Sequence, residues 1–91
     1  KPAKKIYDLI RGLSPYPAAF TYLDGKLLKI YKASYTIADT HHAAGAYNTD
    51  GKTFLQFAAA DGWVQILELQ LEGKKRLEVD AFLRGHRFNN Q

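Results

Sequence analysis

The sequence has 91 residues, 46% hydrophobic and 13% aromatic, which is enough for one small folded core and too little for a second. It contains no cysteine, which excludes disulfides and thiolate chemistry, and no apolar run approaches the roughly 20 residues that cross a bilayer. Thirteen lysines and arginines against nine acidic residues give a net charge of +4, which favours a polyanionic partner.

The chain begins with a predicted amphipathic helix. Pro2 suits its first position, and Gly12 is a candidate stop signal. Charged residues fall largely on the other side of the helix, so its apolar face is expected to lie on a core. Apolar residues spaced three and four apart form that face: Ile6, Leu9, Ile10 and Leu13.

A joint follows the helix. Pro15 and Pro17 fix their own φ at about −65° and bias the residues before them towards extended backbone, so the helix ends and the chain enters a sheet. Tyr16 and Phe20 are expected to pack the helix against the strands. The predicted structural joint consists of Arg11, Pro15, Tyr16 and Pro17.

Short strands are predicted after the joint. Residues 20–23 and 26–37 are typical of strands, and Asp24-Gly25 between them is a hairpin signal. Neither face of 26–37 is cleanly polar, so a twist or bulge midway is expected to change the side that this strand buries. Residues 38–46 are expected to form a loop.

A second group of strands is predicted after that loop. Residues 47–48 and 52–59 surround a tight turn at 49–51, and Asp61-Gly62 is predicted to be a third turn. Residues 63–71 show the clearest alternation. One face is expected to carry Trp63, Gln65, Leu67, Leu69 and Leu71, and the other Val64, Ile66, Glu68 and Gln70.

The last part of the chain is predicted to contain a short helix. Gly73 ends the preceding strand, and Asp80 is expected to cap a helix that carries Phe82 and Leu83, with Gly85 just past its end. Three Asx-Gly turns between short strands, with helices only near the ends, predict a mainly β fold. We expect a small antiparallel barrel of the oligonucleotide-binding type, with about five or six strands, in a single domain.

Five blocks of the sequence carry a resemblance to a known family. They are residues 10–20 (IRGLSPYPAAF), 28–33 (LKIYKA), 61–62 (DG), 69–77 (LQLEGKKRL) and 82–85 (FLRG). With these blocks the chain resembles, across nearly all of its length, the C-terminal domain of the methionyl-tRNA formyltransferases. Two departures are mild: Tyr16 stands where tryptophan is frequent, and Ala18-Ala19 where a pair that includes glycine is commoner.

The resemblance implies a role in a larger enzyme of the bacterial cytoplasm. Such an enzyme transfers a formyl group from 10-formyltetrahydrofolate to the methionine of initiator methionyl-tRNA. Its catalytic residues and folate site belong to an N-terminal domain, so residues 1–91 are expected to be a non-catalytic fragment with no cofactor of its own. The implied partners are initiator methionyl-tRNA and the N-terminal catalytic domain, with no membrane and no metal.

Basic residues are the candidate tRNA contacts. The run after Gly73 comes first, because a turn there can aim two side chains at one phosphate track, although a basic turn can also merely solvate a loop. Lys29 and Lys32 lie on opposite faces of a regular strand, so both can face RNA only if the strand twists or bulges. The predicted tRNA-binding residues are Lys74, Lys75, Arg76, Lys29, Lys32, Lys26, Lys52 and Arg84.

Arg11 has two interpretations. It pairs with Asp8 one turn earlier, or with a carboxylate of the barrel, and so fixes the helix on the sheet. Alternatively, it projects towards RNA. The structural role is preferred because Arg11 adjoins the Pro-Tyr-Pro joint.

Aromatic residues within the strands are candidates for stacking on unpaired bases. Their alternation with aliphatic residues favours the core instead, and stems of a folded tRNA expose few free bases. These residues are Tyr31, Tyr35, Tyr47 and Trp63.

His41-His42, with His86 as a third ligand, suggests a metal site. Adjacent residues of an extended segment point opposite ways, however, and no cysteine or clustered carboxylate completes a tetrahedral set, so no metal is expected. Turn geometry, rather than catalysis, accounts for the three aspartates that precede glycine: Asp24, Asp50 and Asp61.

Two alternative functions remain open. Related barrels follow formyltransferase-type domains in nucleotide-sugar formyltransferases and formyltetrahydrofolate hydrolases, where the domain need not meet RNA. The other alternative is a stand-alone enzyme or metalloprotein, for which metal analysis and mutation of His41 are the tests.

Overall fold

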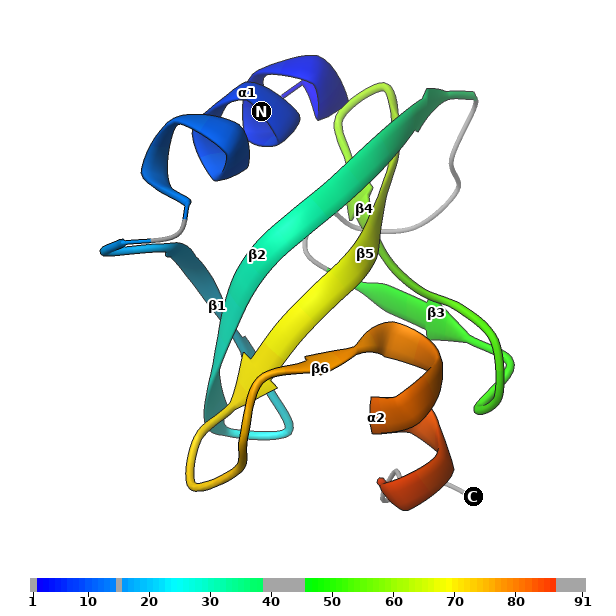
Figure 1. Ribbon diagram of the computed structural model, residues 1–91. Coiled ribbons are helices and arrows are strands. Elements are labelled where there is room, and N and C mark those ends of the chain that lie inside the picture. Colours follow the sequence, from blue (N-terminus) through cyan, green and yellow to red (C-terminus); the bar gives the residue numbers. More distant parts are fainter. Residues whose placement is uncertain (1, 15, 39–45, 87–91) are drawn as a thin grey trace.

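Two helices and six strands make up the described part of the chain, residues 2–14, 16–38 and 46–86 of this computed structural model (Figure 1). The strands form one antiparallel sheet in the order β1-β2-β5-β4-β3, with β6 paired to β5. The predicted mainly β fold is confirmed, as a curled half-barrel with α1 at one end and α2 at the other (Figure 1). In chain order the elements are α1 (Ala3–Leu13), β1 (Ala19–Leu23), β2 (Lys26–Ile37), β3 (Tyr47–Thr49), β4 (Leu55–Ala59), β5 (Gly62–Leu71), β6 (Leu77–Glu78) and α2 (Val79–Gly85).

The helix α1 lies with its apolar stripe on the sheet. Ala3 and Ile10 are buried, and Ile6 and Leu13 pack against the core. The predicted stop at Gly12 is wrong, because the backbone stays helical through that residue and the chain turns only after Leu13.

The N-terminus of α1 is capped by a residue far along the sequence. Pro2 occupies the N-cap and makes no side-chain cap bond. The Ala3 N–H instead donates to Asp61 Oδ1 at 2.8 Å, from the turn between β4 and β5. Asp61 therefore fixes the helix on the sheet in addition to its place in a turn.

A tight connection joins α1 to β1. The Tyr16–Pro17 peptide bond is cis, and Ala18 has a φ of 73°. The Ala18 N–H donates to the Leu13 carbonyl at 2.9 Å, and both Ala18 and Ala19 are buried. Two small side chains are therefore buried where the chain passes from the helix into the sheet.

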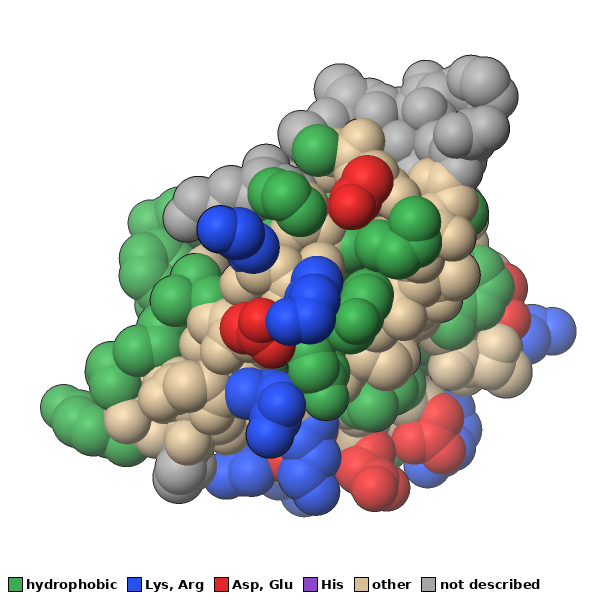
Figure 2. All heavy atoms as spheres, turned by 90° about the horizontal axis from the view of Figure 1, so that it is seen from above, with side chains coloured by type: hydrophobic (Ala, Val, Ile, Leu, Met, Phe, Trp, Pro, Cys, Tyr) green, Lys and Arg blue, Asp and Glu red, His purple; other side chains and the backbone are tan. Residues whose placement is uncertain are grey.

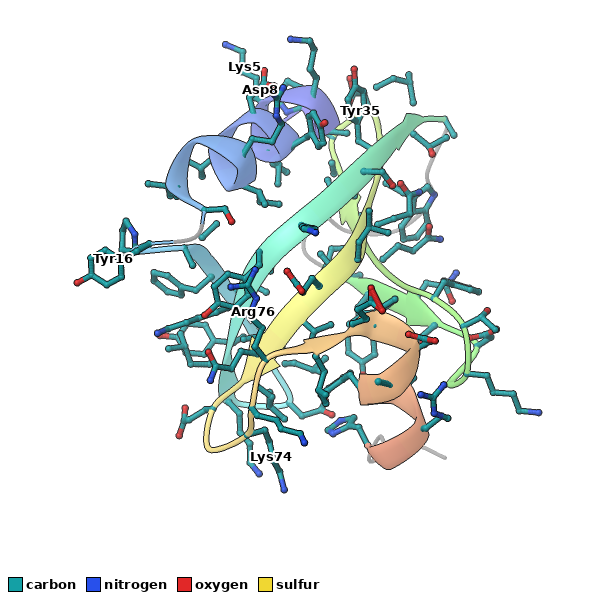
Figure 3. All side chains as sticks on the ribbon, in the orientation of Figure 1. Lys5, Asp8, Tyr16, Tyr35, Lys74 and Arg76 are labelled. Atoms are coloured by element: carbon teal, nitrogen blue, oxygen red, sulfur yellow. The ribbon has the colours of Figure 1, made fainter. Side chains whose placement is uncertain are left out.

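The large aromatic residues of the joint face solvent instead. Tyr16 is 88% exposed and points away from the rest of the molecule, and Phe20 is 60% exposed (Figure 3). The predicted packing of Tyr16 and Phe20 between helix and strands is therefore wrong, because the two alanines between them take that position. Pro15 lies outside the described residues.

The predicted bulge in residues 26–37 is confirmed. The register between β2 and β5 shifts twice, which leaves one extra residue in each strand, Tyr31 in β2 and Leu67 in β5. The single face predicted for residues 63–71 is wrong, because the extra residue shifts the side-chain alternation by one. The buried residues of β5 are Val64 and Ile66 before the bulge, and Leu69 and Leu71 after it.

The first hairpin matches its sequence signal. Asp24 and Gly25 have φ values of 51° and 83°, and the flanking residues Leu23 and Lys26 pair directly. This two-residue turn is the kind that Asx-Gly pairs favour, because its twist agrees with that of the strands.

The strand predicted from residue 52 begins only at Leu55. The Asp50 carboxylate accepts the backbone N–H groups of Lys52, Thr53 and Phe54, which are then not available to a strand partner. The Thr53 hydroxyl and these N–H groups hold the pKa of Asp50 well below its ordinary value.

Gly62 has a different role from the one predicted. Ala59 pairs with Gly62, so the turn between β4 and β5 consists of Ala60 and Asp61, and Gly62 is the first residue of β5. A Cβ on Gly62 would lie 2.0 Å from the carbonyl oxygen of Thr36. Glycine is required there because the end of β2 passes directly against it.

The helix α2 closes the other end of the core. Phe82 and Leu83 are buried as predicted. Asp80 lies in the first turn and contacts Arg84 at 3.4 Å rather than making the predicted cap, and Gly85 is the last helical residue.

Candidate nucleic-acid interface

The bulge places Lys29 and Lys32 on the same outward face of β2. Before it, Ile30 is buried, so Lys29 points outward. After it, Ala33 packs against the core, so Lys32 points outward as well. The condition for both lysines to face one ligand is therefore met.

The turn after β5 brings a second group of lysines to the same region. The Glu72 N–H donates to the Leu27 carbonyl at 2.8 Å, and the Leu27 N–H donates to Glu72 Oε1 at 3.0 Å. Gly73, with a φ of 80°, then reverses the chain. Lys74 projects beyond the end of the sheet, beside the hairpin that carries Lys26 (Figures 1 and 3).

We call the resulting surface the basic rim. None of its members forms an ion pair within the described part of the chain, so their charges are available to a ligand. The rim consists of Lys26, Lys29, Lys32, Lys74 and Lys75.

Two lysines of the rim affect the pKa of His86, the residue that follows α2. Burial lowers the pKa of His86 from its ordinary value, and Lys26 and Lys74 lower it further, whereas Asp24 raises it. Lys26 and Lys74 therefore act on one region of space although they lie far apart in sequence.

Arg76 is exposed, but its guanidinium is held against the sheet by an ion pair and an aromatic ring. Its guanidinium lies 2.6 Å from Glu68 Oε1 and 4.0 Å from the centre of the Tyr31 ring (Figure 3). Tyr31 in turn donates its hydroxyl to Gln70, and the Gln70 amide donates to the Lys74 carbonyl. These contacts fix the turn that carries Lys74 and Lys75 to β2 and β5.

The structure does not bring the two other predicted contacts to the rim. Lys52 lies in the connection between β3 and β4, at the far edge of the sheet order. Arg84 lies on α2 and contacts Asp80. Neither side chain shares a face with the lysines of β2.

Arg11 does not pair with Asp8. Lys4 takes that carboxylate at 3.1 Å, and the Arg11 guanidinium lies 5.6 Å from the centre of the Tyr7 ring. Lys5 and Asp8 point away from the sheet (Figure 3). Seen from the α1 side, basic and acidic side chains lie next to one another, so no continuous positive field covers this end (Figure 2).

Most of the aromatic residues considered for stacking have protein neighbours. Tyr35 lies 5.1 Å from Tyr7 between ring centres, and Tyr47 lies 6.1 Å from Phe57. Tyr31 is covered by the Arg76 guanidinium.

Two exposed aromatic residues on β1 are not among the predicted site residues. Phe20 and Tyr22 are 60% and 62% exposed on the outward face of β1. Their spacing of two in a predicted strand was the available signal, because it places both on one face.

Neither a metal site nor a membrane span is found among residues 2–14, 16–38 and 46–86. No group of three His, Asp or Glu side chains is placed to hold an ion, and neither helix has the length and apolar character to cross a bilayer. His41 and His42 lie outside the described residues.

Comparison with known proteins gives consistent matches. Residues 1–87 match the family described as "Formyl transferase, C-terminal domain". The chain is 51% identical to a methionyl-tRNA formyltransferase of Phocaeicola vulgatus, over 96% of this chain and 28% of that protein. It is 46% identical to the enzyme of Bacteroides thetaiotaomicron (98% and 29%) and 42% identical to that of Lachnospira eligens (94% and 29%). The chain therefore spans less than a third of the length of these relatives.

Proposed function

Because the chain belongs to the formyl transferase C-terminal domain family, we propose that it is the tRNA-holding domain of a methionyl-tRNA formyltransferase. The family resemblance carried by the sequence blocks is confirmed by the match over residues 1–87. The proteins named above are methionyl-tRNA formyltransferases, which supports this enzyme over the nucleotide-sugar and hydrolase alternatives.

The observation that carries the proposal is the basic rim. Five lysines with no ion pair in the described structure lie close together: Lys29 and Lys32 on the outward face of β2, Lys26 at its hairpin end, and Lys74 and Lys75 in the adjoining turn. Lysine ammonium groups neutralise phosphates without reading sequence, which suits a domain that holds the body of a folded RNA. The contacts of Arg76 with Glu68 and Tyr31 hold the adjoining turn in place, so this part of the rim is ordered before a ligand binds.

The chemistry of formyl transfer belongs to the rest of the polypeptide in this proposal. Relatives of this chain are more than three times its length, which leaves room for a separate catalytic domain and its 10-formyltetrahydrofolate. The domain described here raises the local concentration of initiator methionyl-tRNA near that active site and limits how the tRNA lies. Its place is the bacterial cytoplasm, where translation starts.

Binding of initiator tRNA across a salt series tests the proposal. If about four phosphates are neutralised, log K falls against log[salt] with a slope of about −3 to −4, a loss of roughly 100-fold between 50 and 200 mM. A gel shift with the 91-residue chain measures this. Absence of binding at 50 mM salt contradicts the proposal and favours the alternatives in which the domain meets no RNA.

A further inference from the structure

Phe20 and Tyr22 form an open aromatic pair on β1. They are 60% and 62% exposed, with ring centres 6.1 Å apart and ring planes at 88°. Burying such rings against other side chains normally stabilises a protein, so two adjacent rings left in solvent point to a ligand.

The aromatic pair adjoins the basic rim. Phe20 lies directly opposite Lys29, and Tyr22 directly opposite Leu27, so these four side chains share the outward face of the two strands. Beside them is a shallow hollow of about 210 Å³. It is lined by Leu27, Lys29, Gln70, Leu71, Glu72 and Gly73.

We propose that Phe20 and Tyr22 bind an unpaired base of an RNA, while Lys29 and its neighbours in the basic rim bind the adjoining phosphates. Aromatic rings beside uncompensated cations are the combination that holds single-stranded nucleotides, because every base has a face that stacks. Base faces within a duplex are already stacked, so the ligand is a loop or an unpaired end. This inference rests on the proposal that the rim binds RNA.

An apolar protein surface is the rival occupant. Phe20 also lines a hollow of about 430 Å³ beside α1, together with Leu9 and Leu13, and an apolar partner would fit there. Covering the Phe20–Tyr22 face with such a partner would, however, remove the Lys29 ammonium from water without a paired counter-charge, because Glu72, which lines the same hollow, forms no ion pair with it in the described structure, and this is unfavourable. A phosphate supplies that counter-charge, so the observations favour RNA.

Two RNAs with equal numbers of phosphates test the inference on the full 91-residue chain. One is a blunt duplex, and the other is a hairpin with an unpaired loop that contains 2-aminopurine. We expect the double variant Phe20→Val/Tyr22→Val to bind the hairpin about fivefold more weakly or worse, and the duplex unchanged. The 2-aminopurine fluorescence is expected to be quenched by the parent chain and not by the variant.

Two controls separate stacking from other effects. Tyr16→Val removes an aromatic ring that is 88% exposed and lies away from the rim, and it is expected to leave the binding of both RNAs unchanged. Phe20→Tyr with Tyr22→Phe keeps two rings and is expected to restore the preference for the hairpin. Restoration shows that the loss in the valine variant comes from the missing rings and not from a damaged fold.

The outcomes are distinguishable. Duplex binding without a preference for the hairpin, or equal losses on both RNAs in the valine variant, overturns the stacking inference and leaves the basic rim. If neither the duplex nor the hairpin binds at low salt, the proposed function is overturned as well. If the valine variant keeps its hairpin preference but loosens the contact between domains in the full-length enzyme, as followed by limited proteolysis, the pair serves a protein surface.

Discussion

Removing the two lysines of the turn after β5 is the most direct perturbation of the basic rim. Lys74 and Lys75 account for two of its five free charges. With about four phosphates neutralised by the parent chain, Lys74→Ala/Lys75→Ala is expected to halve the salt slope to about −1.8, so that the loss between 50 and 200 mM falls from roughly 100-fold to roughly 10-fold. Neither side chain supports the core, so the fold is expected to persist.

A second double variant with the same net charge is the matched control. Lys5→Ala/Lys52→Ala also removes two charges, from α1 and from the connection between β3 and β4, both away from the rim. Its salt slope is expected to stay within error of the parent slope. Fluorescence anisotropy with labelled initiator tRNA at four or more salt concentrations gives all three slopes.

Two results would refute this reasoning. Equal reductions of slope in both double variants would mean that net charge, and not the position of the rim, governs binding. An unchanged slope for Lys74→Ala/Lys75→Ala would remove the turn from the interface. Thermal unfolding of each variant checks that the comparison is made on folded protein.

Three further predictions concern the stability of the fold. Gly62→Ala is expected to lower the free energy of unfolding by about 3 kcal/mol or more, because the new Cβ would meet a backbone oxygen of β2. Gly12→Ala, at an open helical site, is expected to raise the free energy of unfolding by about 0.5–1 kcal/mol. Urea unfolding measures both, and similar effects at the two glycines would argue against the close approach of β2. Asp61→Ala removes the acceptor of the Ala3 N–H and is expected to cost about 1 kcal/mol, with faster amide exchange in the first turn of α1; unchanged exchange would rule out the cap. Because the pKa of Asp50 is lowered in the folded state, its carboxylate stabilises the fold fully above about pH 4, and this contribution declines as the pH falls below that value. The free energy of unfolding of Asp50→Asn is therefore expected to fall less steeply with decreasing pH than that of the parent chain. The same pH dependence in both proteins would contradict this.

The interface illustrates how far sequence reasoning reaches. The sequence predicted Lys29, Lys32 and Lys74 as contacts, with the condition that a twist or bulge brings Lys29 and Lys32 to one face. The pairing of β2 with β5 contains that bulge. Pairing with Asp8 was one of the interpretations of Arg11, but Lys4, four residues before Asp8 where Arg11 is three residues after it, forms that contact. Both spacings place a cation one turn from the carboxylate, so spacing alone does not decide between them.

The joint shows a second kind of limit. The proline pair correctly predicted the end of the helix, yet the burial of its aromatic residues was predicted the wrong way round, because Ala18 and not Tyr16 fits between helix and sheet. The choice depends on how closely α1 approaches β1, a distance that no single segment encodes.

Within the sequence itself, local physics determined the helix stripe, the Asp24-Gly25 hairpin and the positions of most strands, because each depends on residues only a few positions apart. The tertiary structure alone decided which charges lie together. Lys26 and Lys74 become neighbours through the bonds between Leu27 and Glu72, 45 residues apart, and Lys29 joins them only in the register that β2 adopts on β5. Such long-range register is set by the packing of the whole core, which is why a count of lysines predicts a charged protein and only the folded sheet yields a basic rim.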